Sequence, residues 1–220
     1  MPELLRLEHF GFTYPQQPCP ALADVSLTVR QGEFWVLCGA SGCGKTTLLR
    51  QLKPALRPHG AAEGRILFDG QPLDDLPPHR QAADIGFVLQ SPEEQTVTDK
   101  VWHELAFGLE SLGCDQKTMR ARVAEMACYF GIQDWFHRDV ANLSGGQKQL
   151  LNLASIMAMQ PEILILDEPT SQLDPIAASD FLNTLRKINA ELGTTILITE
   201  HRVEDICLLY TSPSPRDRQK

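Results

Sequence analysis

Gly39-Ala40-Ser41-Gly42-Cys43-Gly44-Lys45-Thr46 is the stretch of sequence that decides the fold, because it completes the phosphate-loop pattern G-x-x-x-x-G-K-[ST]. Its glycines allow the backbone to wrap closely around phosphate groups with the N–H groups pointing inward. Lys45 offers a positive charge to the β and γ phosphate oxygens, and Thr46 offers a hydroxyl to Mg²⁺. The pattern predicts a site for a nucleoside triphosphate.

The residues on either side of this loop have the patterns of a strand and a helix. Residues 33–38 form a nearly continuous apolar run, as a buried strand does, and residues 46–52 read as a short helix. The positive end of that helix would point at the same anion as the loop. This context favours a phosphate site over a glycine-rich turn with an incidental lysine.

Two further segments carry chemistry. Residues 163–168 read Ile-Leu-Ile-Leu-Asp-Glu, an apolar strand that ends in two carboxylates, so that Asp167 can hold Mg²⁺ beside the phosphate loop. Residues 143–147 read Leu-Ser-Gly-Gly-Gln, in which Ser144 and Gln147 have the spacing of a capping box opening an apolar helix. The glycines between them expose backbone N–H groups at the positive helix end, which predicts a second anion site.

Composition limits the class of protein. The 220 residues are 43% hydrophobic and 22% charged, which is typical of one large soluble domain, and no apolar run is long enough to span a bilayer. The N-terminus lacks the pattern of a secretory signal, so the cytoplasm is expected. A formal net charge of −8 argues against a large electrostatic contact with nucleic acid or anionic lipid. The six cysteines show no CxxC pair or metal-ligand spacing, and we expect them to be reduced.

The order of patterns along the chain predicts an α/β fold. Residues 5–10 and 25–30 alternate as half-buried antiparallel strands do, and residues 64–68 and 85–89 are further strands. Residues 91–142 carry helical periodicity and form a predicted helical insertion. Strand and helix then alternate at 163–166, 175–192 and 195–199, which indicates a parallel sheet covered by helices.

The phosphate loop, the Leu-Ser-Gly-Gly-Gln string and the two carboxylates, in this order, resemble the ATP-binding cassette (ABC) family of ATPases. The resemblance runs from about Leu4 to about Ile206. It implies a P-loop ATPase of ABC type: a mainly parallel core sheet flanked by helices, an antiparallel β subdomain and a helical subdomain. It also implies ATP and Mg²⁺ as cofactors, and a single nucleotide-binding domain over residues 1–206.

The resemblance assigns roles to individual positions. In the family, the acid at the place of Glu168 polarises the attacking water, and the glycine string grips the γ-phosphate of ATP bound to a second protomer. The aromatic at the place of Tyr14 stacks on adenine, although an ordinary strand-end aromatic is the alternative. Implied catalytic residues are Glu168, His201, Gln90 and Lys45; implied Mg²⁺ residues are Thr46, Gln90 and Asp167; implied ATP-binding residues are Tyr14, Gly39, Ala40, Ser41, Gly42, Cys43, Gly44, Lys45, Thr46, Thr47, Ser144, Gly145, Gly146, Gln147 and Asp174.

One branch of the family is favoured by residues 90–95, Gln-Ser-Pro-Glu-Glu-Gln, and 106–110, Ala-Phe-Gly-Leu-Glu. They look like the ATPases of energy-coupling factor (ECF) importers, although Leu89 and Ser91 stand where that branch more often has an aromatic and Asn. The implied partners are a second ATPase protomer, identical, different or fused; a transmembrane coupling subunit; and a membrane substrate-binding subunit. The implied location is the cytoplasmic face of the membrane. The helical insertion and the segment from Gln90 to Lys100 are expected to form a groove for a helix of the membrane partner. Trp102, Phe107 and Leu109 are apolar enough to line it, although most such residues belong to the core.

Other functions remain open at this point. The alternatives are the ATPase subunit of another ABC importer or exporter, and a non-transport ABC protein acting on DNA or ribosomes. Only 53 residues separate Gln90 from Ser144, without the heptads of a long coiled coil, and the chain is acidic. A phosphate-loop kinase would not explain the Leu-Ser-Gly-Gly-Gln string.

The last residues, 207–220, do not fit the rest of the chain. They contain Ser-Pro-Ser-Pro-Arg, which cannot continue a sheet because each proline removes a hydrogen-bond donor. Their sequence resembles one reading frame of a transposase-type sequencing adapter. We therefore expect a C-terminally truncated fragment with a non-native tail and an uncovered sheet edge.

Overall fold

The computed structural model describes residues 1–200. The first of its two sheets is antiparallel and contains β1 (Glu3–Thr13), β2 (Leu22–Arg30), β4 (Ala61–Phe68) and β5 (Gln71–Pro72), in the order β2-β1-β4-β5. Alternation sets its faces: Leu5 and Leu7 are buried, whereas Arg6 is exposed. The strands β1, β2 and β4 are longer than the sequence patterns predict, because the backbone ladder continues beyond the apolar positions.

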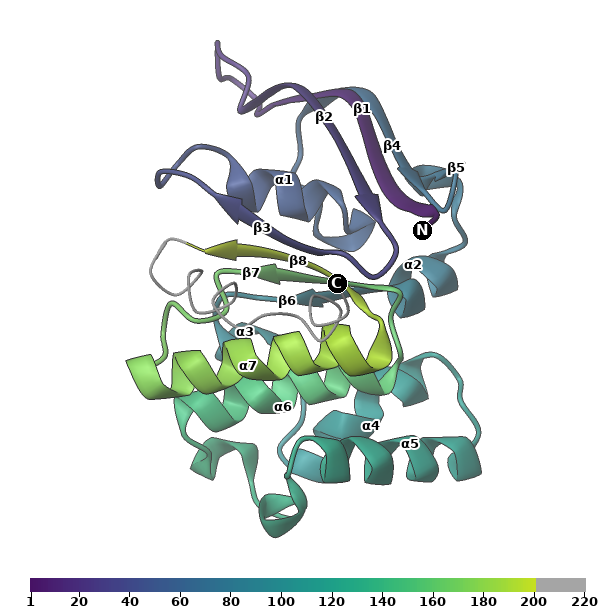
Figure 1. Ribbon diagram of the computed structural model, residues 1–220, viewed down its shortest axis with the longest axis vertical. Coiled ribbons are helices and arrows are strands. Elements are labelled where there is room, and N and C mark those ends of the chain that lie inside the picture. The colour runs from purple at the N-terminus through teal and green to yellow at the C-terminus, as the bar shows by residue number, and fades with distance from the viewer. Residues whose placement is uncertain (201–220) are drawn as a thin grey trace, which may run out of the picture.

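The second sheet is parallel and holds the strands that end at the candidate site. It contains β3 (Phe34–Cys38), β8 (Thr195–Glu200), β7 (Ile163–Asp167) and β6 (Ile85–Val88), in the order β3-β8-β7-β6. Every residue of β6, β7 and β8 is buried, which explains their unbroken apolar sequences. All four strands run in one direction, so their carboxyl ends meet at one edge, on the left in Figure 1.

Helices cover both faces of the parallel sheet. The helix α1 (Lys45–Gln51) lies between the two sheets, and α6 (Gly145–Ala158) and α7 (Pro175–Leu192) lie on the opposite face (Figure 1). Alternate residues of β7 serve two separate cores: Ile163 and Ile165 pack toward α1 and the antiparallel sheet, and Leu164 and Leu166 pack toward α6 and α7. The layers hold the phosphate-loop helix and the glycine-string helix on opposite sides of one sheet.

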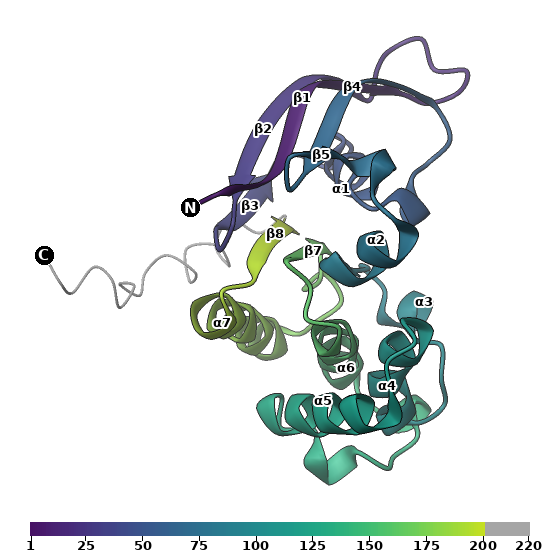
Figure 2. The ribbon, with the colours of Figure 1, turned by 90° about the vertical axis from the view of Figure 1, so that its right-hand side faces the viewer.

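The predicted helical insertion lies beyond α6 (Figure 2). It contains α3 (Pro92–Gln95), α4 (Val101–Ser111) and α5 (Gln116–Tyr129), with 3-10 turns at Gln133–Trp135 and Val140–Asn142. The remaining elements, before the insertion, are α2 (Pro78–Asp84) and 3-10 turns at Pro54–Leu56 and Leu73–Asp75. Leu109 is fully buried in this insertion's core, so the core alternative holds for it and it does not line a surface groove. Trp102 and Phe107, in contrast, are exposed to 43% and 38%.

The expected fold class, an ABC-type α/β fold with an antiparallel β subdomain, is confirmed by these two sheets and their helices. Among residues 1–200, no helix combines the length and the apolar character that crossing a membrane requires. The predictions for His201 and for the tail at 207–220 fall on positions outside the described residues.

Candidate functional site

The phosphate loop joins β3 to α1 at the edge where the parallel strands end. Gly42 and Gly44 have φ of 80° and 96°, a conformation that favours glycine. A Cβ on Gly44 would lie 2.8 Å from the Ala21 carbonyl oxygen, so the loop is packed closely against the start of β2. Lys45 is buried, and its Nζ donates to the carbonyl oxygens of Gly39 (2.8 Å) and Ala40 (3.2 Å). The ammonium is therefore held over the loop that it is predicted to serve.

Both carboxylates at the end of β7 lie beside this loop. The Thr46 hydroxyl donates to Asp167 Oδ1 (3.0 Å), and Asp167 is 3% exposed. The neighbouring strand β8 adds Thr199, whose hydroxyl donates to the same Oδ1 (3.0 Å) and accepts the Glu168 N–H (2.9 Å). These contacts fix Asp167 toward Thr46 and hold the backbone of Glu168 at the end of the strand.

Glu168 has a strained backbone and a polar neighbour from another strand. Its φ is 47°, in the left-handed region that L-residues with long side chains rarely adopt. Gln90, which follows β6, donates its Nε2 to Glu168 Oε2 (3.2 Å). Strain of this kind persists only where the surrounding structure enforces it, and it occurs often at functional sites.

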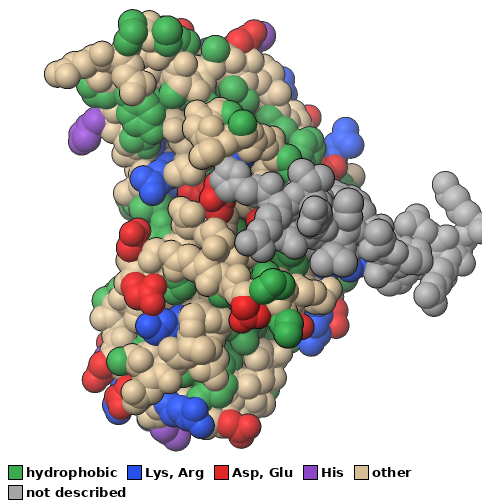
Figure 3. All heavy atoms as spheres, turned by 90° about the vertical axis from the view of Figure 1, so that its left-hand side faces the viewer, with side chains coloured by type: hydrophobic (Ala, Val, Ile, Leu, Met, Phe, Trp, Pro, Cys, Tyr) green, Lys and Arg blue, Asp and Glu red, His purple; other side chains and the backbone are tan. Residues whose placement is uncertain are grey.

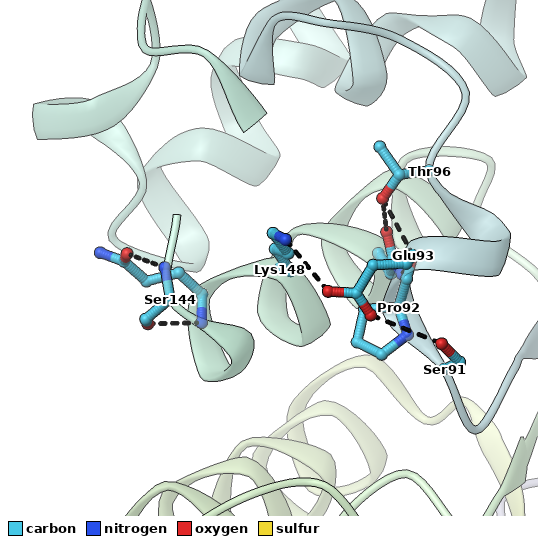
Figure 4. Close-up of polar contacts among 8 residues, drawn as sticks. Ser91, Pro92, Glu93, Thr96, Ser144 and Lys148 are labelled. Carbon is cyan, nitrogen blue, oxygen red and sulfur yellow. Dashed lines mark hydrogen bonds and ion pairs between the residues drawn. The ribbon is translucent and has the colours of Figure 1, made fainter. Parts of the chain in front are cut away.

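The glycine string begins α6, and the predicted capping box is confirmed. The Gln147 N–H donates to Ser144 Oγ (3.3 Å), and the Ser144 N–H donates to Gln147 Oε1 (2.9 Å) (Figure 4). Gly145 is exposed, and a Cβ there would meet nothing within 4 Å. The start of α6 is therefore open to an approaching group, while α1 begins on the other side of the sheet.

The remaining predicted residues are placed as follows. Tyr14 donates to or accepts from the Thr47 hydroxyl (2.9 Å) and packs edge-on against Phe12, so it lies beside α1. Asp174 caps α7 by accepting the N–H groups of Ile176 and Ala177 (both 3.0 Å). The structure thus brings Lys45, Thr46, Asp167, Glu168 and Gln90 together, and places Ser144 and Asp174 at the starts of α6 and α7.

Sequence reasoning missed Thr199 and Gln149. Thr199 holds both carboxylate residues, and its only signal is its place at the end of a strand parallel to β7. Gln149 is fully buried on α6, as is Asn152 three positions later, among the apolar buried residues of that helix. A polar residue at a predicted core position was the available signal.

Figure 3 shows the side of the molecule at which the parallel strands end, where acidic and basic side chains lie among hydrophobic side chains, backbone and uncharged polar side chains. A salt bridge links α6 to the segment after β6: Lys148 Nζ lies 3.0 Å from Glu93 Oε1 (Figure 4). This hydrogen bond holds the pKa of the Glu93 carboxyl below its usual range. The segment after Gln90 is thereby tied to the helix that starts at the glycine string.

Comparison with known proteins connects this geometry to a family. The family model described as ABC transporter matches residues 22–171. A putative ABC transporter ATP-binding protein of Bacillus cereus is 48% identical over 205 residues, which are 93% of this chain and 37% of the relative. Another, from Methanosarcina acetivorans, is 40% identical over 205 residues, which are 92% of this chain and 33% of the relative. The chain spans about a third of the length of these curated relatives.

Solved structures of ABC proteins are similar in fold to this chain. The structure of CbiO1 from Clostridium perfringens, described as part of the ABC transporter complex CbiONQ, has a TM-score of 0.84 at 30% identity, covering 94% of this chain and 82% of that one. A dimeric ATP-binding cassette in a post-hydrolysis state, bound to ADP and Pi, has a TM-score of 0.78 at 25% identity, covering 93% and 91%. Because the family model covers more than half of the 220 residues, the chain belongs to the ABC transporter family of ATPases.

Proposed function

We propose that the chain is an ATP-hydrolysing cassette that powers a membrane transporter, and that two cassettes close head to tail around two ATP molecules. The observation that carries this proposal is the position of the two anion sites. Lys45 and Thr46 begin α1 on one face of the parallel sheet, and Ser144 begins α6 on the other. Each composite site then takes its phosphate loop from one cassette and its glycine string from the other.

The hydrolytic step follows from the groups at the ends of β6 and β7. The phosphate-loop N–H groups and Lys45 hold the β and γ phosphates. Glu168 accepts a proton from the attacking water, whose oxygen bonds to the γ-phosphorus as the bridging bond to the β-phosphate breaks. Gln90, at 3.2 Å from Glu168 Oε2, orients that carboxylate. The Thr199 hydroxyl holds the Glu168 backbone in place.

The residues present fit Mg²⁺ carried in by ATP. Thr46 and Asp167 supply a hydroxyl and a carboxylate oxygen 3.0 Å apart, which are the oxygen donors that Mg²⁺ prefers. Mg²⁺ usually keeps several waters and is held by one or two protein oxygens together with substrate phosphates, and these two residues match that donor set. When bound, the ion would neutralise charge on the β and γ phosphate oxygens.

Within the family, the ECF importer branch is supported by the Gln-Ser-Pro-Glu-Glu-Gln segment and by the similarity to CbiO1. We place the chain at the cytoplasmic face of the membrane, with a transmembrane coupling subunit and a membrane substrate-binding subunit as further partners. The second cassette is a copy of this chain, a different chain, or a cassette in the same polypeptide. An ATPase subunit of another ABC importer or exporter is the second candidate.

A groove between the sheet domain and the helical insertion is our candidate docking place for the membrane partner. It has a volume of about 280 Å³ and is lined by Lys53, Gln95, Val97, Phe107 and Met159, among others. Val97 is 64% exposed and Phe107 38%, so apolar surface is available to an incoming helix. A cross-link from Glu94→Cys to the coupling subunit would support this place. Cross-linking only from the distal α5 would contradict it.

The proposed activity is tested with Glu168→Gln and Lys45→Ala. Glu168→Gln removes the base but leaves the phosphate loop, so we expect normal ATP affinity, loss of hydrolysis and an ATP-dependent dimer. Lys45→Ala should lose ATP binding itself. Hydrolysis by Glu168→Gln at the wild-type rate would contradict the assignment of the base.

A further inference from the structure

The buried amide of Gln149 has no hydrogen-bond partner. Gln149 lies on α6, five positions after Ser144, and is 0% exposed. Neither its Nε2 nor its Oε1 has a hydrogen-bond partner within the protein. In residues 1–200, the only other buried side-chain nitrogen or oxygen without a partner is Nε2 of Gln51. An unpaired buried polar group costs about 1–3 kcal/mol. The other fully buried polar residue of this helix, Asn152, does have a partner, because its Nδ2 donates to the Pro92 carbonyl oxygen (3.1 Å). The unpaired amide of Gln149 therefore indicates a polar ligand.

A small cavity is lined by Gln149. Its volume is about 30 Å³, and its lining includes Gln149, Gln90, Glu93, Gly145 and Gln172. A water molecule occupies roughly 30 Å³ in the liquid and needs two to four polar partners. The cavity has room for one water, and the amide and carboxyl side chains in its lining supply polar groups.

The cavity lies where three functional segments meet. Gln90 follows β6 and donates to Glu168, Gly145 belongs to the glycine string, and Gln172 belongs to the loop after β7. Direct contacts already tie the first two segments: Lys148 pairs with Glu93, and Asn152 Nδ2 donates to the Pro92 carbonyl oxygen (3.1 Å) (Figure 4). Gln149 lines the cavity together with residues of all three segments.

We propose that Gln149 binds one internal water in this cavity, and that the water bridges the start of α6 to Gln90 and to the loop after β7. Gln149 is then a positioning residue for Glu168, acting through Gln90, and this role rests on the proposed ATPase function. No residue of the phosphate loop lines the cavity. Loss of the bridge should lower turnover while ATP affinity stays the same.

The direct test is a high-resolution crystal structure of the 220-residue chain. We expect one ordered water within hydrogen-bond distance of the Gln149 amide, with further bonds to at least one of the other two segments. A dry cavity would overturn the proposal. This readout does not depend on catalysis, so it stands even if the proposed function fails.

The functional test compares Gln149→Leu with Gln51→Leu, which removes the other buried amide with an unpaired nitrogen. We expect Gln149→Leu to lower kcat about tenfold with the ATP Kd unchanged, because the groups around the reacting atoms are displaced. Gln51→Leu should shift Tm by about as much as Gln149→Leu does, but should leave kcat unchanged. A kcat of Gln149→Leu within twofold of wild type, or an equal loss in both variants, would overturn the positioning role. Hydrolysis by Glu168→Gln would instead count against the proposed function.

Discussion

Glu168 is placed by its backbone as much as by its side chain. Its φ of 47° directs the chain sharply away from β7, and the Thr199 hydroxyl accepts its N–H at 2.9 Å. A left-handed conformation costs an L-residue about 1–2 kcal/mol. The bond from Thr199 offsets part of that cost, and the carboxylate gains a position next to Gln90.

The two glycines of the phosphate loop should differ in their tolerance of alanine. Both have positive φ, so each substitution should cost about 1–2 kcal/mol of unfolding free energy. A Cβ at Gly44 also collides with the Ala21 carbonyl oxygen, at 2.8 Å, whereas a Cβ at Gly42 meets nothing within 4 Å. We expect Gly44→Ala to lose at least about 1 kcal/mol more than Gly42→Ala in urea unfolding. Equal losses would contradict this packing of the loop on β2.

Lys53 should make stability depend on pH in the alkaline range. Its Nζ donates to the Gln81 carbonyl oxygen (2.7 Å), and burial lowers the pKa of Lys53 from near 10.5 to about 8, opposed by Asp84. At a pH between these values the unfolded chain holds a proton that the folded chain has released, so stability rises with pH. We expect the free energy of unfolding in urea to rise for wild type relative to Lys53→Met as the pH increases from about 7.5 to about 9.5. A constant difference between them would contradict the lowered pKa.

At the scale of elements, α4 is fixed to the segment before it by one carboxylate. Glu104 is 4% exposed, and its Oε2 accepts the Val97 N–H (3.2 Å), the Thr98 N–H (2.8 Å) and the Thr98 hydroxyl (2.8 Å). Hydrogen bonds to a charged acceptor contribute about 1.5–3 kcal/mol each. This contact shapes one wall of the candidate docking groove, which Val97 and Glu104 both line.

Glu104→Gln should loosen that wall without affecting ATP. The amide oxygen can still accept from these donors, but it carries no negative charge, so the hydrogen bonds lose their charge assistance. We expect a loss of about 2 kcal/mol and faster hydrogen exchange at Val97 and Thr98. Glu110→Gln, on the exposed side of the same helix, should change stability by less than about 0.5 kcal/mol. Unchanged exchange at Val97 and Thr98 in Glu104→Gln would show that the carboxylate does not hold the segment.

The elements themselves were largely predictable, because apolar runs and alternation report directly on burial. The wholly buried β7 and the capping box at Ser144 are examples. The polar residues that organise the site were not: Thr199, Glu104 and Gln149 are single residues within strand or helix patterns. The role of Thr199 depends on which strands become neighbours in space, and a local pattern carries no record of that. Glu104 binds the segment just before its own helix, but the helix pattern does not mark its carboxylate as the acceptor. For Leu109 the pattern left core and groove open, since both faces of α4 carry apolar residues and only packing distinguishes them.

At the scale of the whole molecule, the layers determine what one chain can do alone. The parallel sheet separates α1, which begins at Lys45, from α6, which begins after Ser144. The chain also spans only about a third of the length of its curated relatives. We expect a complete ATP site to form only when the phosphate loop of one cassette meets the glycine string of another.

Mixing two inactive variants tests this central claim most directly. Lys45→Ala disables the phosphate loop and Ser144→Arg blocks the glycine string, so each variant alone should be inactive. A mixed dimer has one site with both defects and one site with neither. Equal amounts should restore ATP hydrolysis to about a quarter of the wild-type rate, because half of the dimers are mixed and each has one intact site. A mixture as inactive as its components would show that both motifs serve one site within a single chain, and would contradict the head-to-tail dimer.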